Sequence, residues 1–402
     1  MKTYLKNCNL VDLNKETCEK VSILIEDGRI NKIDNSTKLI SDKLLTIDLK
    51  GKYAHPGLWD VHTHIGDLIP DPNNYLETET IAEYTIRAGK NTIDGLKKGI
   101  TSIRIVGEDG DVCLAWKKMF KKKGFLGPDI YTARRAISAT GGHGHGTLGA
   151  YEIDGPYEMR KAVRENISKG ADLIKIMVSG GIMTEHEGMQ DSQLTDDEII
   201  AAVELASNRD MIVAAHAWST EGIKKALRCG VRSIEHGLLD DECVDLLLEK
   251  DAYYIPTICQ TQDMGKILES GLPQFMIDKA LSVKEIHLEG FKKAYKAGVK
   301  IACGSDSSPL KEFTHLELKH LHLAGMSIID TLKSGTIVPA ELCGVSNEYG
   351  EIKENFVADI IVLNENPLKN LETIFDPLMV FKNGIRFDEQ YGLTSFEDVY
   401  LN

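Results

Sequence analysis

The stretch "HPGLWDVHTH", His55–His64, decides the fold that we expect. A Pro-Gly turn precedes an apolar run, and the run closes on His62 and His64, two residues apart. Side chains two residues apart on a strand project from the same face, so this pair could hold one ion from the inside of a sheet. The stretch therefore predicts a strand whose end can bind a metal.

Seven further apolar runs of strand length follow this one, and segments with helical periodicity separate most of them. In chain order the eight runs are "LWDVHTH", "ITSIRIVG", "IYTARRAIS", "ADLIKIMVSGG", "MIVAAHA", "VRSIEHG", "AYYIPTI" and "VKIACGSDS". Eight parallel strands that alternate with helices predict a (β/α)8 TIM barrel over residues 56–354. An open doubly wound sheet is disfavoured because the chain has no early Gly-rich phosphate turn.

The two ends of the chain have a different character from the barrel region. "VSILIEDGRINKID" alternates apolar and polar residues and contains an Asp-Gly hairpin signal. Near the other end, "VADIIVLNENPL" and "PLMVFKNGIRF", the latter with an Asn-Gly pair, again predict a strand and a hairpin. We expect residues 1–55 and 355–402 to pair as a composite β-sandwich side domain.

Composition and charge narrow the class of protein. Asp and Glu outnumber Lys and Arg by 61 to 47, and the resulting formal charge of −14 repels phosphate backbones and anionic lipid surfaces. No run of about 18 apolar residues occurs, and the N-terminus lacks a signal-type apolar core. The eight cysteines form no C-x-x-C pair. We therefore expect a cytoplasmic protein that binds neither nucleic acid nor membrane.

Metal-competent or unusual polar residues gather late in the predicted strands. Barrel enzymes place their chemistry at the carboxyl ends of the strands, so residues there would meet at one mouth. Six such residues lie in or at the ends of five runs: His62, His64, Lys175, His216, His236 and Asp306. A single histidine of this kind is usually a core or surface residue, but coincidence at five strands favours a metal site.

Lys175 needs its own explanation, because a charged lysine would repel a metal ion. It lies in "ADLIKIMVSGG", with apolar residues on both sides, and burial disfavours the ammonium form. A deprotonated lysine amine can add carbon dioxide to give a carbamate, which would supply a bridging carboxylate. A buried salt bridge beside a single-metal site is the alternative.

The ordered set of motifs resembles the amidohydrolase superfamily. The set comprises D-x-H-x-H at Asp60–His64, Lys175, A-H-A at Ala215–Ala217, I-E-H-G at Ile234–Gly237 and G-S-D at Gly304–Asp306. More narrowly, "TGGHGH", "ADLIKIMVSGGIM" and "YGEIKENFVADIIVLNENPL" resemble the branch of zinc-dependent Xaa-Pro and Xaa-Arg dipeptidases (prolidase- and arginine carboxypeptidase-like) and imidazolonepropionase-related proteins. The resemblance spans about Asp12 to about Arg386.

The resemblance implies a binuclear zinc site whose two ions share a hydroxide, a nucleophile near neutral pH. His62, His64 and Asp306 would hold one ion. His216 and His236 would hold the other, and carbamylated Lys175 would bridge the two. Asp306 would also orient the hydroxide, accept its proton and pass that proton to the leaving amine.

Residues beyond the metal ligands are expected to contact the substrate. The Gly-rich loop "ATGGHGHGTLG" carries His143, which the resemblance assigns to polarising the scissile carbonyl, and His145, a second contact or a plain loop residue. Trp218 stands where relatives often carry Tyr or His, so it is a third candidate contact.

The segment "GGIMTEHEGMQD" carries three acids that could select a cationic side chain, although a solvated loop is the default: Glu185, Glu187 and Asp191. His315, His320 and His322 have helical spacing, and we expect them on a helix surface rather than at a second metal site.

These observations predict a zinc-dependent hydrolase that cleaves the amide bond of a dipeptide or N-acyl amino acid, assembled as a homo-oligomer. A cyclic amide hydrolase, imidazolonepropionase- or hydantoinase-like, is the nearest alternative. A deaminase is a second, which Lys175 disfavours because such relatives generally use one metal and lack the bridging lysine. A catalytically inactive scaffold on the same barrel is a third, disfavoured because all six ligands are present.

Overall fold

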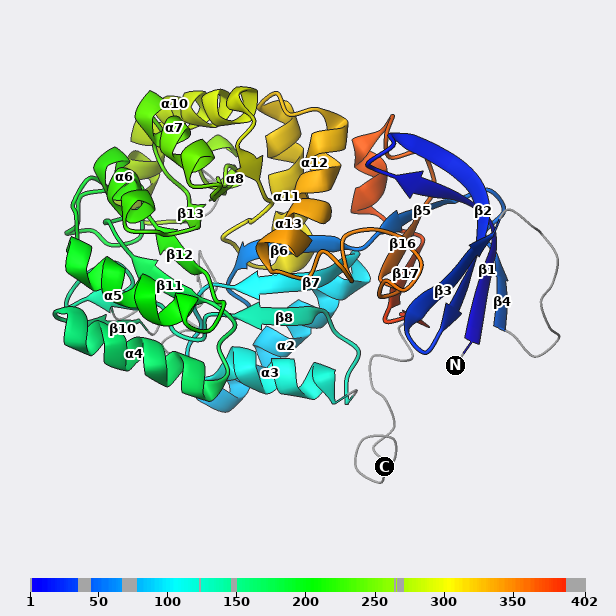
Figure 1. Cartoon of the computed structure of the whole chain (residues 1–402), viewed down its shortest axis with the longest axis horizontal. Coiled ribbons are helices and arrows are strands. Elements are labelled where there is room, and N and C mark those ends of the chain that lie inside the picture. The colour runs from blue at the N-terminus through cyan, green and yellow to red at the C-terminus, as the bar shows by residue number, and fades with distance from the viewer. Residues whose placement is uncertain are drawn as a thin grey trace.

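The computed structural model describes residues 2–34, 45–66, 78–122, 124–145, 150–263, 265 and 271–387. A helix-covered barrel fills one end of the molecule, and a curved sheet built from both chain ends fills the other (Figure 1). None of the helices in these ranges combines the length and apolar character needed to cross a membrane.

The barrel contains every one of the eight predicted strands. They are β6 (Leu58–Thr63), β7 (Ile100–Ile105), β8 (Asp129–Thr132), β11 (Ile174–Met177), β12 (Val213–His216), β13 (Ser233–Glu235), β14 (Tyr253–Ile255) and β15 (Lys300–Ile301). Neighbouring strands pair in parallel, and the runs are apolar because both of their faces are buried. The predicted fold class is confirmed.

The third predicted strand is longer than a single barrel strand and is divided. β8 covers its first part, and β9 (Ile137–Ala139) covers the rest and pairs with β11 and with β10 (Tyr151–Ile153). Arg134, between the two parts, has a φ of 65°, which interrupts an extended chain. The loop that carries His143 leaves from the end of β9.

Hydrogen bonds at two seams close the strands into a ring. Asp172 N–H donates to Thr132 O over 2.7 Å, which joins β8 to β11. Val61 N–H donates to Cys303 O over 2.9 Å, which joins β6 to the segment that extends β15. The first and last barrel strands are therefore neighbours, and their carboxyl ends share one mouth.

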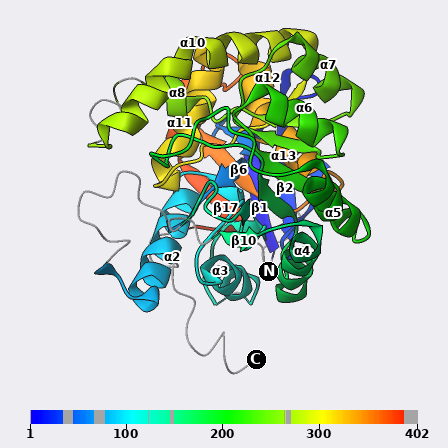
Figure 2. The same cartoon turned by 90° about the vertical axis from the view of Figure 1, so that its left-hand side faces the viewer.

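Helices surround the ring of strands, as the view along the barrel shows (Figure 2). Several begin at side-chain caps, such as Thr80, Ser219 and Asp240, which accept hydrogen bonds from backbone N–H groups of the first turn. The helices are α2 (Ile81–Lys97), α3 (Val112–Lys121), α4 (Pro156–Lys169), α5 (Asp196–Ser207), α6 (Thr220–Arg228), α7 (Asp241–Glu249), α8 (Cys259–Gln262), α10 (Gln274–Ala297), α11 (Leu310–Leu323), α12 (Ile328–Ser334) and α13 (Ile337–Leu342).

The helical spacing predicted for three histidines is confirmed in α11, but their surface position is wrong for one of them. His315 is buried and its ring lies 5.2 Å from the ring of Phe375, because this side of α11 packs against the 3-10 helix η1 (Leu371–Phe375). His320 and His322 are partly exposed.

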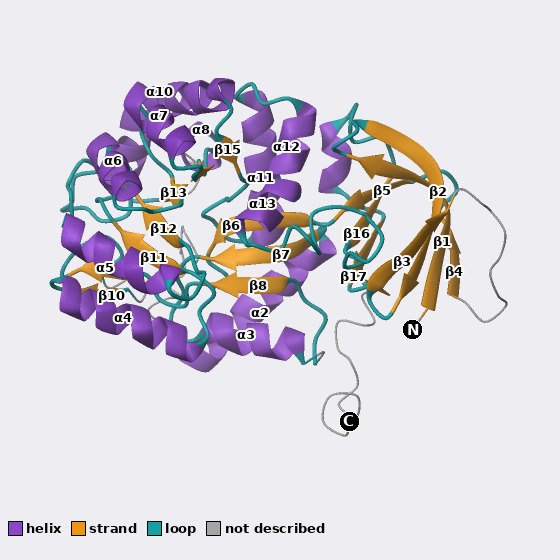
Figure 3. Cartoon of the chain, in the orientation of Figure 1, coloured by secondary structure: helices purple, strands orange, loops and turns teal. Residues whose placement is uncertain are grey.

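The side domain is one eight-stranded sheet built from both chain ends (Figure 3). It comprises β1 (Lys2–Asp12), β2 (Thr17–Glu26), β3 (Arg29–Asp34), β4 (Leu45–Asp48), β5 (Tyr53–Pro56), β16 (Ile360–Leu363), β17 (Met379–Lys382) and β18 (Ile385–Arg386). β5 and β16 pair antiparallel and join the two ends. The composite side domain is confirmed, whereas the boundaries at 55 and 355 stay a prediction, and residues 388–402 lie outside the described ranges.

On one side β1 pairs with two different strands, and the side domain has a hydrophobic core of its own. The first part of β1 pairs with β4 and the last part with β5, and a bulge between Leu5 and Cys8 separates the two. Apolar residues from both branches, including Ile23 and Ile360, form one buried cluster. The two chain ends thus bury a core that neither could bury alone.

A buried ion pair network attaches the side sheet to the barrel. Lys382, on β17, is 1% exposed, and its ammonium lies 2.6 Å from a carboxylate oxygen of Asp359 and 2.6 Å from one of Asp129. Asp129 is the first residue of β8. The side sheet therefore packs at the amino-terminal ends of barrel strands, away from the mouth.

We expect the free energy of unfolding to fall as the pH drops from about 6.5 to about 4. Burial lowers the pKa of His55, His287 and His315 to about 4 each, and Nε2 of each ring is buried without a hydrogen-bond partner among the described residues. In this window the unfolded chain takes up protons that the folded chain rejects, which costs about 1–3 kcal/mol per histidine. Urea unfolding at several pH values measures the loss. The slope of the free energy of unfolding against pH should be smaller in His315→Gln. An unchanged slope would contradict the lowered pKa of His315.

Candidate metal centre and active site

Three side chains predicted to hold one ion meet at the barrel mouth. The ligand atoms of His62, His64 and Asp306 all lie within 4.8 Å of one another. Oδ1 of Asp306 is 3.2 Å from Nε2 of His62 and 3.3 Å from Nε2 of His64. Nδ1 of His64 is held at 2.7 Å by the carbonyl of Gly107, so Nε2 is the nitrogen that faces the carboxylate. This is the donor set of a divalent metal.

Asp60 holds the first and last barrel strands together at this point. Its buried carboxylate accepts hydrogen bonds from Oγ of Ser305 at 2.6 Å and from Oγ1 of Thr314 at 2.8 Å. Asp306 N–H in turn donates to the carbonyl of His62 over 2.7 Å. Gly304 is required here, because a Cβ at this position would lie 2.6 Å from Cβ of His62. The first residue of the D-x-H-x-H motif therefore positions a ligand from the other end of the barrel.

His216 and His236 lie beside this cluster. The ring of His236 is 4.8 Å from that of His62 and 4.7 Å from that of His216, and Thr257 holds its Nδ1 at 2.8 Å. Burial, together with nearby positive charge, lowers the pKa of both His216 and His236 well below the usual value. Both rings are therefore neutral at neutral pH, as metal coordination requires.

Two of these residues have a backbone conformation that non-glycine residues seldom adopt. The φ angle is 67° at His236 and 52° at Asp306. Such angles persist only where the surrounding contacts impose them, and they cluster at functional sites. The hydrogen bond from Asp306 N–H and a further one, from His236 N–H to the carbonyl of Ile255 over 2.9 Å, supply that constraint.

Lys175 lies in the same interior, 1% exposed. Burial lowers the pKa of its amine to about 8, and the charge of Arg104 acts in the same direction, whereas Glu235 and Asp306 oppose the shift. No hydrogen bond to its amine is formed within the part of the chain that the structure describes. A buried amine that is easily deprotonated and lacks a partner suits the predicted carbamate.

A buried carboxylate holds His62, one of the candidate metal ligands, in place. Glu235 lies 2.7 Å from Nδ1 of His62 and accepts a hydrogen bond from Arg104 over 2.8 Å and another from Ser233 over 2.6 Å. Although burial raises the pKa of Glu235, the Arg104 charge and the His62 hydrogen bond outweigh it and hold that pKa far below the usual range. Glu235 is therefore ionised, and it leaves Nε2 of His62 to face Asp306.

The predicted substrate contacts fall into two groups. The ring of His143 stacks on that of His216 with centroids 4.0 Å apart, which places it at the mouth. Trp218 is 2% exposed and stacks on His236 at 5.2 Å. His145 is instead 59% exposed and pairs with Glu152. The structure thus brings His143 and Trp218 to the metal ligands but not His145, and the roles of all three stay predictions.

The three acids of the segment after β11 also differ in their surroundings. Glu187 is buried and hydrogen-bonded to Nδ1 of His143, while Asp191 accepts a hydrogen bond from Gly188 N–H over 2.6 Å. Glu185 is exposed. The carboxylate of Glu187 is occupied by this chain and is not free to bind a cationic substrate.

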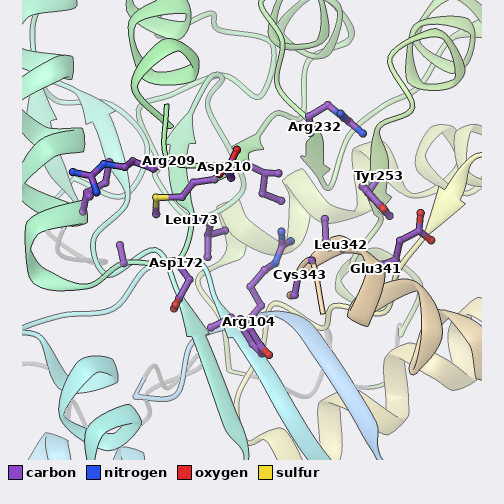
Figure 4. Close-up of a pocket in the computed structure, with 16 residues that line it drawn as sticks. Arg104, Asp172, Leu173, Arg209, Asp210, Arg232, Tyr253, Glu341, Leu342 and Cys343 are labelled. Carbon is purple, nitrogen blue, oxygen red and sulfur yellow. The ribbon is translucent and has the colours of Figure 1, made fainter. Parts of the chain in front are cut away.

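A cavity of about 600 Å³ lies at the opposite end of the barrel (Figure 4). Part of its lining comes from residues that precede or begin barrel strands, such as Leu173, Arg232 and Tyr253. Arg104 and the end of α13 with the two residues after it, 341–344, line another part. None of the predicted metal ligands lines it. The cavity is therefore separate from the metal centre.

Four residues hold predicted site residues in place, a role that the sequence analysis did not assign to them. Arg104 and Glu235 are charged residues inside strands that are otherwise buried, and this was the available signal. Glu187 and Gln193 lie in a polar loop segment, where sequence offers no such signal. Only the folded chain shows that these two contact His143.

Comparisons with known proteins agree with this geometry. The model of the amidohydrolase family matches residues 53–386. The chain is 30% identical to ochratoxinase from Aspergillus niger over 404 residues, which cover 89% of this chain and 83% of ochratoxinase. Among solved structures it is similar to a Xaa-Pro dipeptidase with methionine bound in the active site (30% identity, TM-score 0.88, 96% of this chain and 100% of that chain). A prolidase in complex with N-methylphosphonate-L-proline is also similar (29% identity, TM-score 0.89, 96% and 100%).

We expect Glu235→Gln to lower the affinity of the site for a divalent metal, measured with zinc, about 10- to 100-fold, because the amide holds His62 less strongly than the carboxylate does. It should also lower the free energy of unfolding by about 3–5 kcal/mol, since the Arg104 charge loses its buried partner. Chelator competition and urea unfolding measure the two effects.

The double variant Glu235→Gln/Arg104→Met separates these effects. It removes both buried charges, so stability should recover while zinc affinity stays low. Asp94→Asn, which breaks an exposed ion pair with Lys90, is the control and should change neither quantity. Full zinc affinity in Glu235→Gln would contradict the support of His62 by Glu235.

Proposed function

The chain belongs to the amidohydrolase family, and we propose that within it this protein hydrolyses the amide bond of dipeptides or N-acyl amino acids at a binuclear zinc site. The observation that carries the proposal is the meeting of His62, His64 and Asp306 at the barrel mouth beside the buried amine of Lys175. A metal-dependent amidohydrolase needs such a donor set, and the bridging lysine distinguishes a site for two ions from a site for one.

The residues present fit two zinc ions. His62, His64 and Asp306 would hold one ion, and His216 and His236 the other, with carbamylated Lys175 between them. His216 and His236 are neutral because their pKa values lie well below the usual value, and Asp306 is ionised because His62 and His64 lower the pKa of its carboxyl despite burial. Burial lowers the pKa of the Lys175 amine to about 8, which brings its neutral form within reach. When bound, the ions would activate a water molecule and polarise the amide carbonyl.

The chain's own groups then supply proton transfer and orientation. The carboxylate of Asp306 lies between the two groups of histidines, 3.2 Å from His62 and 3.8 Å from His236, where it can accept the proton of an attacking water and return it to the leaving amine. The ring of His143 stacks on that of His216, and with a hydrogen on both ring nitrogens it can donate from Nε2 to the carbonyl oxygen as negative charge develops there.

The substrate class follows from the relatives. The dipeptidase has methionine bound in its active site, and the prolidase is in complex with N-methylphosphonate-L-proline, so each binds an amino acid or a derivative of one. We infer that the leaving group here is also an amino acid. Trp218, buried against His236, would give this chain an apolar contact where relatives often carry a polar one.

The alternatives differ in what the site must bind. A cyclic amide hydrolase could use the same ligands, so only substrates separate it from the proposed function. A deaminase with one metal ion needs no bridging ligand, so it would not account for the buried amine of Lys175. A cytoplasmic location and a homo-oligomeric state stay predictions of the sequence.

A hydrolysis screen tests the proposal. Zinc-loaded protein in bicarbonate should cleave members of a panel of Xaa-Arg, Xaa-Lys and Xaa-Pro dipeptides and N-acyl amino acids in preference to cyclic amides and nucleobases. Metal analysis should give two zinc ions per chain. Cleavage confined to cyclic amides, or fewer than one zinc ion per chain, would contradict it.

Lys175→Ala should lower kcat/KM at least about 10³-fold, or about 4 kcal/mol of transition-state stabilisation. The loss is expected because the bridging carboxylate disappears, and short-chain carboxylic acids should restore part of the activity. Lys161→Ala, at an exposed position on α4, is the matched control. Wild-type activity in Lys175→Ala would rule out the bridging role.

A further inference from the structure

His143 is held by a polar network that none of the motifs indicates. Its Nδ1 is hydrogen-bonded to Oε1 of Glu187, and its backbone N–H donates to Oε1 of Gln193 over 2.8 Å. The amide of Gln193 donates in turn to Oε2 of Glu187 over 2.7 Å, and Gly181 N–H donates to Oε1 over 2.9 Å. Both carboxylate oxygens of Glu187 are therefore engaged, and the loop after β9 is fastened to the loop after β11.

The carboxylate of Glu187 determines which ring nitrogen faces the substrate. An ionised carboxylate only accepts hydrogen bonds, so Nδ1 of His143 carries a hydrogen and Nε2 points the other way. To donate to a carbonyl oxygen, Nε2 must carry a hydrogen as well, so the catalytic form of the ring is an imidazolium paired with Glu187. Nε2 has no hydrogen-bond partner among the described residues. The ring plane is fixed as well, because one face stacks on His216 and a Cβ at Gly181 would lie 2.3 Å from Cε1.

Lys279, on α10, holds the segment that carries Glu187. Its ammonium donates to three backbone carbonyls, those of Gly181 at 3.2 Å, Thr184 at 2.5 Å and Glu187 at 2.6 Å. These contacts match the three donors of an ammonium group. The segment 181–187 is neither helix nor strand, so few other contacts restrain its backbone. A helix on the barrel exterior thereby fixes the position of a carboxylate at the mouth.

We propose that Glu187 and Lys279 are positioning residues for the hydrolytic reaction: Lys279 fixes segment 181–187, and Glu187 on that segment orients His143 so that Nε2 faces the substrate carbonyl. This inference rests on the proposed function for its catalytic consequence. Its structural part, the orientation of the ring and the rigidity of the segment, does not depend on any substrate.

A double-mutant cycle tests the action of Glu187 through His143 in the zinc-loaded enzyme. Glu187→Gln should lower kcat about 10- to 100-fold through misplacement of the ring, with KM and zinc content close to wild type. In the His143→Ala background the same substitution should have no further effect. Wild-type kcat, an equal loss in both backgrounds, or a loss of zinc in Glu187→Gln would each overturn the inference.

Amide hydrogen exchange tests Lys279 without any substrate. Lys279→Met keeps the aliphatic stem but removes the ammonium, and exchange in residues 181–187 should accelerate about tenfold. Lys292→Met on the same helix, which loses only an exposed ion pair with Glu289, should leave the segment unchanged. Unaltered exchange in Lys279→Met would overturn the role of Lys279.

The two proposals fail in distinguishable ways. If the wild-type enzyme hydrolyses no amide, the proposed function fails, but ring nitrogen shifts in ¹⁵N-histidine-labelled protein still report the state of His143. A protonated Nδ1 in wild type that is lost in Glu187→Gln supports the positioning of the ring. A ring state that is the same in both proteins overturns it even if hydrolysis is observed.

Discussion

The candidate metal site depends on the hydrogen bonds of Asp60, which hold the two ends of the barrel together. This carboxylate joins β6 to the segment after β15, and it bonds to Ser305, which lies 245 residues further along the chain. The contact places His62 and Asp306 side by side and determines where the first ion could sit. The other two histidines predicted to bind metal follow from the order of the parallel strands, since β12 and β13 bring His216 and His236 to the same mouth.

Two buried carboxylates of the site are compensated by partners that they also hold in place. Arg104 and Glu235 neutralise each other, and Glu235 also fixes His62. Glu187 performs the equivalent task for His143 on the rim. Each carboxylate thus determines which nitrogen of one imidazole is presented to the mouth, and the rings are preorganised before any ligand arrives.

The fold, and the meeting of the candidate ligands at one mouth, could be predicted from the sequence because their signals are local. A strand buried on both faces is an unbroken apolar run, and a histidine at its end is visible in the same few residues. The support of these ligands was not predictable, because Glu235 meets Arg104 and His62 only across the barrel. The same holds for Glu187, whose neighbours in the chain suggest a solvated loop, and for His315, which is buried by a segment some 60 residues later. A contact between residues far apart in the chain cannot be predicted from a pattern of a few neighbouring residues.

The pairing of β5 with β16 has a consequence for synthesis on the ribosome. Residues 53–56 emerge early, but their partner residues 360–363 emerge only after the whole barrel has been translated. Until then the apolar faces of β1, β2 and β5 lack part of the cluster that covers them. The nascent chain must therefore carry an incomplete sheet through most of its elongation, and chaperones that shield exposed strands would act on this segment first.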